Sequence, residues 1–177
     1  MQMDMMFTGF GGQGILMMGK IIALAALKEG KEVAWVPSYG PEMRGGTAYC
    51  TVVIGDEPIG SPIIKNPMYL VAMNQPSMEK FAALVKPNGM VLKNSSLVPI
   101  NSNRTDLKEY EIAANEIANE LGTVKVANVV ALGAFVERSG IFSLDLIRDV
   151  LMQELSKKPD LLNINLKAIE RGKKCVS

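Results

Sequence analysis

The chain has 177 residues, of which 48% are hydrophobic, 6% aromatic and 21% charged. This length suits one domain with a sizeable core, and 19 basic against 18 acidic residues give a net charge of +1. A near-neutral chain without a basic block interleaved with aromatic residues is a poor match to nucleic acid or to a membrane surface. No apolar run reaches the ~18 residues of a membrane span, and the N-terminus lacks the basic stretch of a signal peptide. We therefore expect a cytoplasmic protein with no nucleic-acid or membrane partner.

Histidine is absent, and the chain has only two cysteines, Cys50 and Cys175. Ser-His-Asp or Cys-His catalysis and histidine-ligated zinc or haem are therefore excluded. Two thiols cannot hold an iron–sulfur cluster that needs four thiolates, and they provide no disulfide framework. A lone cysteine in a strand usually packs as a small hydrophobe, so we predict no catalytic and no metal-binding residue.

A glycine-rich turn connects two apolar segments, Met3 to Phe7 and Ile15 to Glu29. This pattern predicts a buried strand, a tight turn and a helix that ends at a glycine. Three of the glycines have the G-x-G-x-x-G spacing of phosphate-binding turns, and glycine lets a ligand approach the backbone closely. The N–H groups of the first helical turn would point toward that ligand, with the positive end of the helix dipole behind them. We therefore predict phosphate binding by Gly9, Gly11, Gly12, Gln13 and Gly14.

The spacing alone leaves other interpretations open. The glycines can simply allow the helix to pack closely against the sheet, with no ligand. A nicotinamide site needs an acidic residue about 20 positions further on, where the second strand ends. That strand, Glu32 to Val36, is followed by Pro37-Ser38-Tyr39, and the first carboxylate after it is Glu42. This arrangement argues against NAD binding.

A second glycine-rich loop, PSYGPEMRGG at residues 37–46, follows the second strand. Open α/β sheets bind ligands at the carboxyl ends of their strands, so we expect this loop beside the first turn. Arg44 would contact an anion or a carboxylate of a partner, and Ser38 and Glu42 would line the same mouth. The alternative is that Glu42 and Arg44 pair with each other or face solvent.

The remaining segments continue the alternation of strands and helices. They predict strands at 47–54, 69–73, 90–93 and 110–113, and helices at about 76–86, 114–121, 126–137, 144–155 and from Asp160 or Asn163 onward. The helices at 15–29 and 126–137 are apolar nearly all round, which indicates burial on more than one side, and Trp35 is expected in the core. We predict one Rossmann-like, three-layer α/β domain over residues 1–177, with a mostly parallel sheet, helices on both faces and a loose tail at 170–177.

Several short motifs point to one family. They are GFGGQGI at 9–15, PSYGPEMRGGT at 37–47, Cys50, NQPS at 74–77, KPxG at 86–89, NSS at 94–96 and VANxVALG at 126–133. Over about residues 5 to 140 the chain resembles the gamma subunit of 2-oxoacid:ferredoxin oxidoreductases. The PSYGPEMRGG form is most similar to the 2-oxoglutarate branch, whereas pyruvate-type subunits tend to carry a PSFGAERRG-like version.

The resemblance implies a subunit of an enzyme that decarboxylates a 2-oxoacid, here 2-oxoglutarate to succinyl-CoA, and passes two electrons to ferredoxin. The chain lacks the cysteines for a cluster and a GDG…N segment for thiamine diphosphate. Thiamine diphosphate, magnesium and iron–sulfur clusters would therefore lie on alpha and beta partner subunits, or on alpha, beta and delta subunits. This chain would supply subunit contacts and help to receive coenzyme A at the glycine turn.

Three hypotheses remain to be compared. The first is this gamma subunit, with a pyruvate or branched-chain 2-oxoacid version as its alternative. The second is a stand-alone nucleotide-binding oxidoreductase that uses a nicotinamide or a flavin. The third is a non-catalytic assembly scaffold whose glycine turn has only a structural role.

Overall fold

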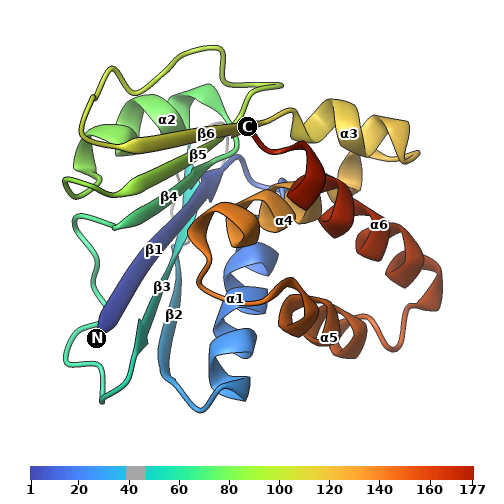
Figure 1. The fold of residues 1–177 in the computed structure, drawn as a ribbon, viewed down its shortest axis with the longest axis horizontal. Coiled ribbons are helices and arrows are strands. Elements are labelled where there is room, and N and C mark those ends of the chain that lie inside the picture. The colour runs from blue at the N-terminus through green and yellow to red at the C-terminus, as the bar shows by residue number, and fades with distance from the viewer. Residues whose placement is uncertain (39–46) are drawn as a thin grey trace.

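The computed structural model describes residues 1–38 and 47–177, which alternate between strands and helices (Figure 1). The strands are β1 (Gln2–Gly9), β2 (Glu32–Ser38), β3 (Ala48–Gly55), β4 (Tyr69–Ala72), β5 (Met90–Asn94) and β6 (Lys108–Ile112). The α-helices are α1 (Ile15–Lys28), α2 (Gln75–Phe81), α3 (Ala114–Glu120), α4 (Ala127–Ser139), α5 (Leu144–Glu154) and α6 (Pro159–Cys175). Short 3-10 turns at Ala82–Leu84 and Val124–Val126 extend α2 and precede α4.

The strands form a single sheet in the order β2-β3-β1-β4-β5-β6. The neighbours β1, β4, β5 and β6 run parallel to one another, whereas β3 runs antiparallel to both β1 and β2. β2 therefore runs in the same direction as β1, with β3 between them. The central strands are apolar and buried, as is typical of sheets that are covered on both faces. The predicted α/β fold with a mostly parallel sheet is confirmed.

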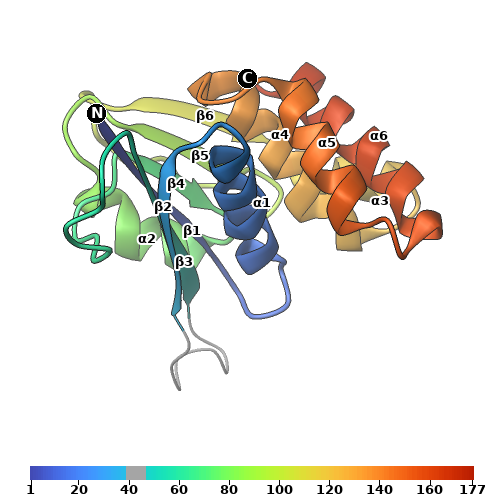
Figure 2. The same cartoon turned by 90° about the horizontal axis from the view of Figure 1, so that it is seen from below.

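Successive side chains of β1 face two different cores, because side chains alternate across a strand. Met5 and Phe7 pack with α1 and α4 on one face, whereas Met6 packs with Phe81 of α2 on the other. The rings of Phe7 and Phe135 meet edge to face with their centroids 5.4 Å apart, a favourable geometry for aromatic pairs. Figure 2 shows α1 and α2 on opposite sides of the sheet. The predicted three layers are therefore present.

α4 is the most deeply buried helix in the described residues, and all its residues from 127 to 136 are buried. It lies between the sheet and α6, where two glycines allow the helix backbones to meet. A Cβ atom added to Gly133 would overlap the carbonyl of Ile169, and one added to Gly172 would overlap the carbonyl of Val130. The prediction that this apolar segment is buried on more than one side is confirmed.

The C-terminal residues correct the prediction of a loose tail at 170–177. α6 continues to Cys175, because Gly172 serves close helix packing and does not end the helix. Val176 is buried, and its carbonyl accepts a hydrogen bond of 2.8 Å from Arg138. The backbone of Ser177 exchanges two hydrogen bonds with Glu111 of β6, at N···O distances of 2.8 and 3.1 Å. These contacts attach the tail to the edge of the sheet.

The side chain of Trp35 is also less buried than the sequence led us to expect. β2 is an edge strand, and 37% of Trp35 remains exposed. Its indole nitrogen lies close to Gly19 of α1, where an added Cβ would be 3.0 Å away. Within the described residues, no helix combines the length and the hydrophobicity needed to cross a membrane.

Candidate functional site

The Gly9–Gly14 turn lies between two adjacent strands whose following helices cover opposite faces of the sheet. β1 leads through this turn into α1 on one face, and the adjacent parallel strand β4 leads through Asn74 into α2 on the other face. The carboxyl ends of β1 and β4 therefore meet at a topological switch point. Open α/β sheets form their ligand-binding crevice at such a point. The predicted anion-binding turn is thus in the position that this fold class uses for ligands.

The backbone of the turn has the geometry that its glycines permit. The Gln13 N–H donates to the Phe10 carbonyl at 3.2 Å and closes the turn. Gly12 has φ +88° and Gly14 has φ +73°, which are left-handed conformations that favour glycine. Gly14 is the N-cap of α1, and no described side chain caps that helix end. Gly11 and Gly12 are exposed, so solvent or a ligand can reach the first-turn N–H groups.

The side chain of Gln13 fixes the turn against the end of β4. Its Oε1 accepts from the Phe10 N–H at 2.6 Å and from Asn74 Nδ2 at 3.5 Å, while its Nε2 donates to the Met73 carbonyl at 3.3 Å. A Cβ atom on Gly9 would lie only 2.6 Å from that Oε1. The amide of Gln13 therefore has partners within the chain, and Gly9 is a glycine because this amide needs the space.

A second amide, on Asn128 of α4, contacts the other end of the turn. Asn128 Nδ2 donates to the Gly14 carbonyl at 3.2 Å, and a Cβ atom on Gly14 would overlap that nitrogen. Only 5% of Asn128 is exposed. Sequence reasoning placed this residue within a buried apolar helix and assigned it no role. The available signal was its position as the single polar side chain in the run Val126 to Val136.

Ser38, which was predicted to line the same mouth, lies further along this edge of the sheet. It ends β2 and stands opposite Tyr49 of β3, which in turn pairs with Thr8 of β1. Two strand spacings of about 4.8 Å separate it from β1. Ser38 and Tyr49 line a pocket of about 240 Å³ on the face of the sheet that α2 covers. Glu42 and Arg44, the other predicted members, lie outside the described residues.

Cys50 packs under the first turn of α1. It is fully buried, and its Sγ donates to the Ile15 carbonyl at 3.4 Å. Burial raises the pKa of the Cys50 thiol to about 12, although hydrogen bonds from Trp35 and Gly19 act in the opposite direction. A thiol that stays protonated at neutral pH is a poor nucleophile. Its predicted role as a small hydrophobe agrees with this environment.

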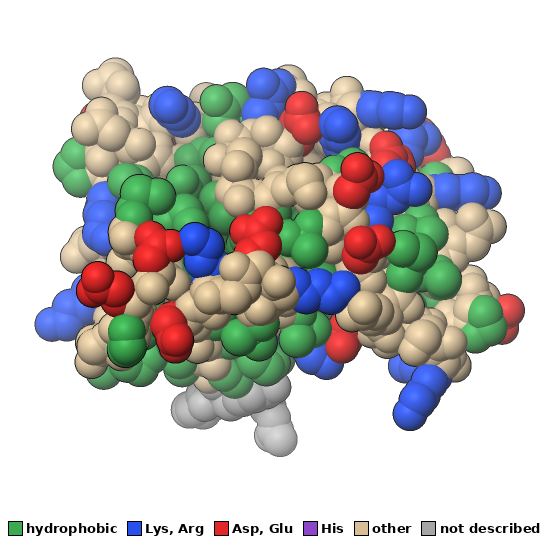
Figure 3. Space-filling model, turned by 60° about the horizontal axis from the view of Figure 1, so that its bottom comes forward, with side chains coloured by type: hydrophobic (Ala, Val, Ile, Leu, Met, Phe, Trp, Pro, Cys, Tyr) green, Lys and Arg blue, Asp and Glu red, His purple; other side chains and the backbone are tan. Residues whose placement is uncertain are grey.

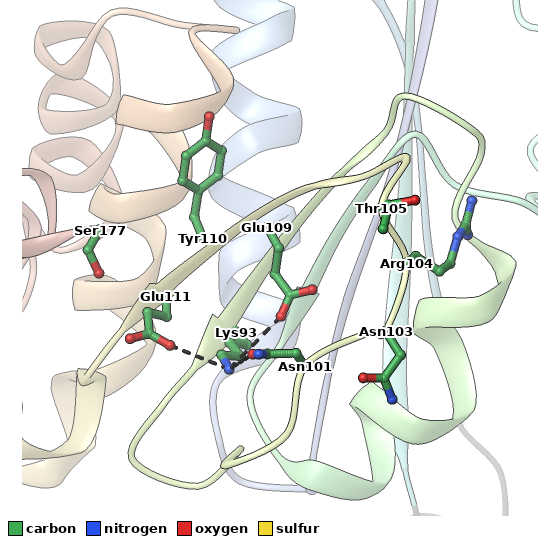
Figure 4. Close-up of a pocket in the computed structure, with 9 residues that line it drawn as sticks. All are labelled: Lys93, Asn101, Asn103, Arg104, Thr105, Glu109, Tyr110, Glu111 and Ser177. Atoms are coloured by element: carbon green, nitrogen blue, oxygen red, sulfur yellow. Dashed lines mark hydrogen bonds and ion pairs between the residues drawn. The ribbon is translucent and has the colours of Figure 1, made fainter.

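A larger pocket of about 640 Å³ lies at the opposite edge of the sheet, beside β6 (Figure 4). One of the residues that line it is Lys93, whose side chain is 6% exposed. Lys93 Nζ donates to the Ile100 carbonyl at 3.0 Å and to Asn101, and it lies 3.4 Å from Glu111 and 3.9 Å from Glu109. Lys93 is thus paired within the chain, and Arg104, another lining residue, pairs with Asp106, which indicates a structural role. Glu109 Oε1 is buried without a hydrogen-bond partner among the described residues.

The surface charge is mixed. On the face that Figure 3 shows, basic and acidic side chains alternate, with hydrophobic side chains between them. Mixed signs cancel at a distance and provide little steering of a charged polymer. This face therefore offers no large field of one sign to a nucleic acid.

Comparison with known proteins identifies the relatives of the chain. Residues 4–175 match the family described as "Pyruvate ferredoxin/flavodoxin oxidoreductase". The ketoisovalerate oxidoreductase subunit VorA of Methanothermobacter marburgensis is 44% identical over 167 residues, which are 93% of this chain but 34% of that relative. The 2-oxoglutarate synthase subunit KorC of Methanocaldococcus jannaschii is 35% identical over 97% of this chain and 92% of its own length. This chain thus spans about a third of the first relative and nearly all of the second.

Two solved structures share the fold over almost the whole chain. The gamma subunit of a keto/oxoacid ferredoxin oxidoreductase from Geobacter sulfurreducens superposes with a TM-score of 0.88 at 29% identity, over 99% of this chain and 96% of that chain. The 2-oxoglutarate:ferredoxin oxidoreductase from Magnetococcus marinus, solved with 2-oxoglutarate, coenzyme A and succinyl-CoA bound, gives a TM-score of 0.87 at 26% identity, over 98% of this chain and 30% of that chain. The chain described here therefore belongs to the pyruvate ferredoxin/flavodoxin oxidoreductase family.

Proposed function

We propose that this chain is the gamma subunit of a multi-subunit 2-oxoacid:ferredoxin oxidoreductase, that it contacts the other subunits and that it helps to bind coenzyme A. The observation that carries the proposal is a glycine turn at a topological switch point, in a chain that matches a gamma subunit over nearly its full length. The alpha and beta subunits, with or without a delta subunit, would complete the complex. Ferredoxin would be reduced by that complex in the cytoplasm.

The turn suits a phosphate of coenzyme A better than it suits a reacting group. Main-chain N–H groups of Gly11, Gly12 and Gly14 would donate to the phosphate oxygens, and the α1 dipole would favour the negative charge by about 0.3–1 kcal/mol. The predicted contribution of the Gln13 N–H is corrected, because this group already donates to the Phe10 carbonyl. Gly12 has open space around it within the part of the chain that the structure describes, because an added Cβ would meet no described atom within 4 Å. Glu42 and Arg44 are proposed to line the same mouth, and Ser38 lies further along this edge of the sheet.

The side chains that would bind the metal ions of such an enzyme are not grouped together in the described residues. Those residues contain no group of three His, Cys, Asp or Glu side chains that could hold a metal ion. Cys50 is buried and Cys175 is exposed on a different element, so the two thiols do not form a cluster site. Thiamine diphosphate, magnesium and iron–sulfur clusters are therefore assigned to the partner subunits, and decarboxylation and electron transfer to them as well.

A mixing experiment tests the proposal. Neither the isolated chain nor the remaining subunits should reduce ferredoxin in a coenzyme A-dependent manner, and mixing them should restore turnover. If the remaining subunits run at full rate alone, the assignment is wrong. Micromolar binding of NAD(P)H or FMN by the isolated chain, measured by calorimetry, would favour the stand-alone oxidoreductase. The scaffold hypothesis would be favoured by two results together. The complex would need the chain for activity, and substitutions in the glycine turn would leave the KM for coenzyme A unchanged.

The substrate is proposed to be 2-oxoglutarate, on the basis of the PSYGPEMRGG motif. A branched-chain 2-oxoacid is the second candidate, because the identity to the ketoisovalerate subunit (44%) exceeds that to the 2-oxoglutarate subunit (35%). The reconstituted complex should be assayed for kcat/KM with 2-oxoglutarate, 2-oxoisovalerate and pyruvate. A preference for 2-oxoisovalerate would replace the first candidate by the second.

A further inference from the structure

We infer that Asn128 is a positioning residue for the coenzyme A site, acting through the carbonyl of Gly14; the inference rests on the proposed function. Asn128 is 114 residues away from Gly14 in the sequence and belongs to a different helix, so this contact forms only through the tertiary fold. The bond joins the second residue of α4 to the N-cap of α1.

The physical argument begins with the peptide plane between Gly14 and Ile15. The Gly14 carbonyl and the Ile15 N–H belong to one rigid, planar group and point in opposite directions. Gly14 has φ +73° and no side chain, so its own conformation restrains this plane weakly. Asn128 Nδ2 donates to the carbonyl at 3.2 Å, and the Met18 N–H donates to the same oxygen at 3.2 Å. A carbonyl held by two donors fixes the direction of the Ile15 N–H on the opposite side of the plane.

The turn is thereby fixed at both ends by neutral amides. Gln13 binds the Phe10 N–H and the Met73 carbonyl at the β1 end, and Asn128 binds the Gly14 carbonyl at the α1 end. The exposed Gly11 and Gly12 lie between these two points. Donors whose directions are fixed before the ligand arrives lose less conformational freedom on binding. Asn128 should therefore lower the KM for coenzyme A without touching the ligand.

The surroundings of position 128 accept few residue types. The site needs a short donor, because the amide nitrogen occupies the space that a Cβ on Gly14 would take. It also needs a neutral group, because a carboxylate beside the N-terminus of α1 would repel an incoming phosphate. Asn128→Asp keeps the shape, removes the donor and adds that charge, whereas Asn128→Ala removes the amide alone.

The chain supplies a matched control in Asn165 of α6. Asn165 is 7% exposed, and its Nδ2 donates to the Leu161 carbonyl at 2.7 Å within its own helix. Asn165→Ala therefore removes an equally buried amide-to-carbonyl bond without affecting the glycine turn. Thermal unfolding would show whether the Ala variants of Asn128 and Asn165 lose similar stability.

The test uses the reconstituted complex and measures kcat and the KM for coenzyme A separately. Asn128→Ala should raise this KM about fivefold, the effect of one lost hydrogen bond, and Asn128→Asp should raise it further, with kcat changed less than twofold in both. Asn165→Ala should leave the KM unchanged. Hydrogen exchange provides a second readout if Asn128→Ala folds poorly, because the Met18 amide, which donates to the same Gly14 carbonyl, should exchange faster in the isosteric Asn128→Asp chain.

The outcomes separate this inference from the proposed function. A carboxylate at the exposed Gly12 tests the coenzyme A site directly, without passing through Asn128. If Gly12→Asp raises the KM and the Asn128 variants do not, Asn128 is only structural and the proposed site stands. If neither change moves the KM, the turn is not the coenzyme A site and both ideas fail. If Asn165→Ala raises the KM as much as Asn128→Ala does, the effect is general destabilisation and the inference is wrong.

Discussion

The glycine turn and the Lys93 pocket show two ways of building a polar region in one sheet. The turn is held by neutral amides, and no side chain of residues 1–38 or 47–177 caps the N–H groups at the start of α1. The pocket has a volume of about 640 Å³, but its buried ammonium group is already surrounded by carbonyl and carboxylate oxygens of the same chain. Glu109 Oε1 of the pocket is buried without a hydrogen-bond partner among the described residues, so the candidate binding site is distinguished by exposed backbone N–H groups at a topological switch point and not by the volume of a cavity.

The largest expected effect distinguishes two glycines within the turn. Gly14→Ala introduces a Cβ that overlaps Asn128 and is strained at φ +73°, whereas Gly12→Ala is strained at φ +88° but meets open space. Strain and overpacking together should lower the free energy of unfolding by about 2–4 kcal/mol for Gly14→Ala, and strain alone by about 1 kcal/mol for Gly12→Ala. Urea unfolding at 25 °C measures both. Equal losses would show that Asn128 does not restrain the turn.

The second prediction concerns the other region. Lys93→Met removes the ammonium group and leaves the carboxylate of Glu109, whose side chain is 19% exposed, without its neighbouring cation. The free energy of unfolding should fall by about 2 kcal/mol, less than for a fully buried pair. Lys20→Met, which breaks the exposed pair with Glu154, is the control and should cost less than about 1 kcal/mol.

The Lys93→Met variant also tests whether coenzyme A binds at the glycine turn or at the Lys93 pocket. Because Lys93 has its partners within the chain, Lys93→Met should leave the KM for coenzyme A in the reconstituted complex unchanged. A large increase in that KM, together with an unchanged KM in the glycine-turn variants, would indicate that coenzyme A binds at the β6 edge and not at the turn.

Much of the fold could be predicted from local patterns, because alternating apolar strands and helices determine the layers. The glycine turn was predicted from its spacing, and the structure shows where it lies in the sheet. The contact between Asn128 and Gly14 could not be predicted, since it joins residues that only the tertiary fold brings together. The packing of Gly172 against α4 was missed for a similar reason, because a glycine near the end of a chain has the same local signature as a helix stop. The exposure of Trp35 depends on β2 being an edge strand, and the order of strands in a sheet cannot be predicted from local sequence patterns.

The third prediction concerns the packing beneath the turn. The pKa of Cys50 is raised from 9.0 to about 12 by burial. Between these two pH values the thiol is protonated in the folded chain and deprotonated in the unfolded chain. The contribution to stability is therefore complete below pH 9 and is lost as the pH rises toward 12. Between pH 8 and pH 10, the free energy of unfolding should fall by about 1 kcal/mol more in the natural chain than in Cys50→Ala.

Thiol labelling provides an independent check on Cys50. Cys175 is exposed and should react rapidly with a thiol reagent, whereas Cys50 should react only when the chain unfolds. Rapid reaction of both thiols in the folded chain would contradict the close packing of Cys50 under α1.

The smallest effect is expected at the amino-terminal end of β1, far from the turn. Hydrogen bonds from Lys31 and from the N-terminal ammonium lower the pKa of Asp56 from 3.8 to about 2. A lowered pKa in the folded state stabilises the chain above about pH 4, and that contribution is lost as the pH falls toward 2. Asp56→Asn should therefore show a shallower loss of thermal stability between pH 4 and pH 2, with the KM for coenzyme A unchanged. An identical acid profile in both chains would contradict the assignment.

The most direct test of the central claim compares Asp with Asn at position 12 in the reconstituted complex. Any side chain is strained at the φ of +88° of Gly12, but Asn and Asp adopt left-handed backbone more often than other residues and should be strained to a similar extent. The position is open among the described residues, and the two variants differ chiefly in charge. If the turn binds a phosphate of coenzyme A, Gly12→Asp should have a KM for coenzyme A about tenfold above that of Gly12→Asn, because like charges repel at this short range, with similar kcat and thermal stability. Equal KM values for the two variants would contradict the account.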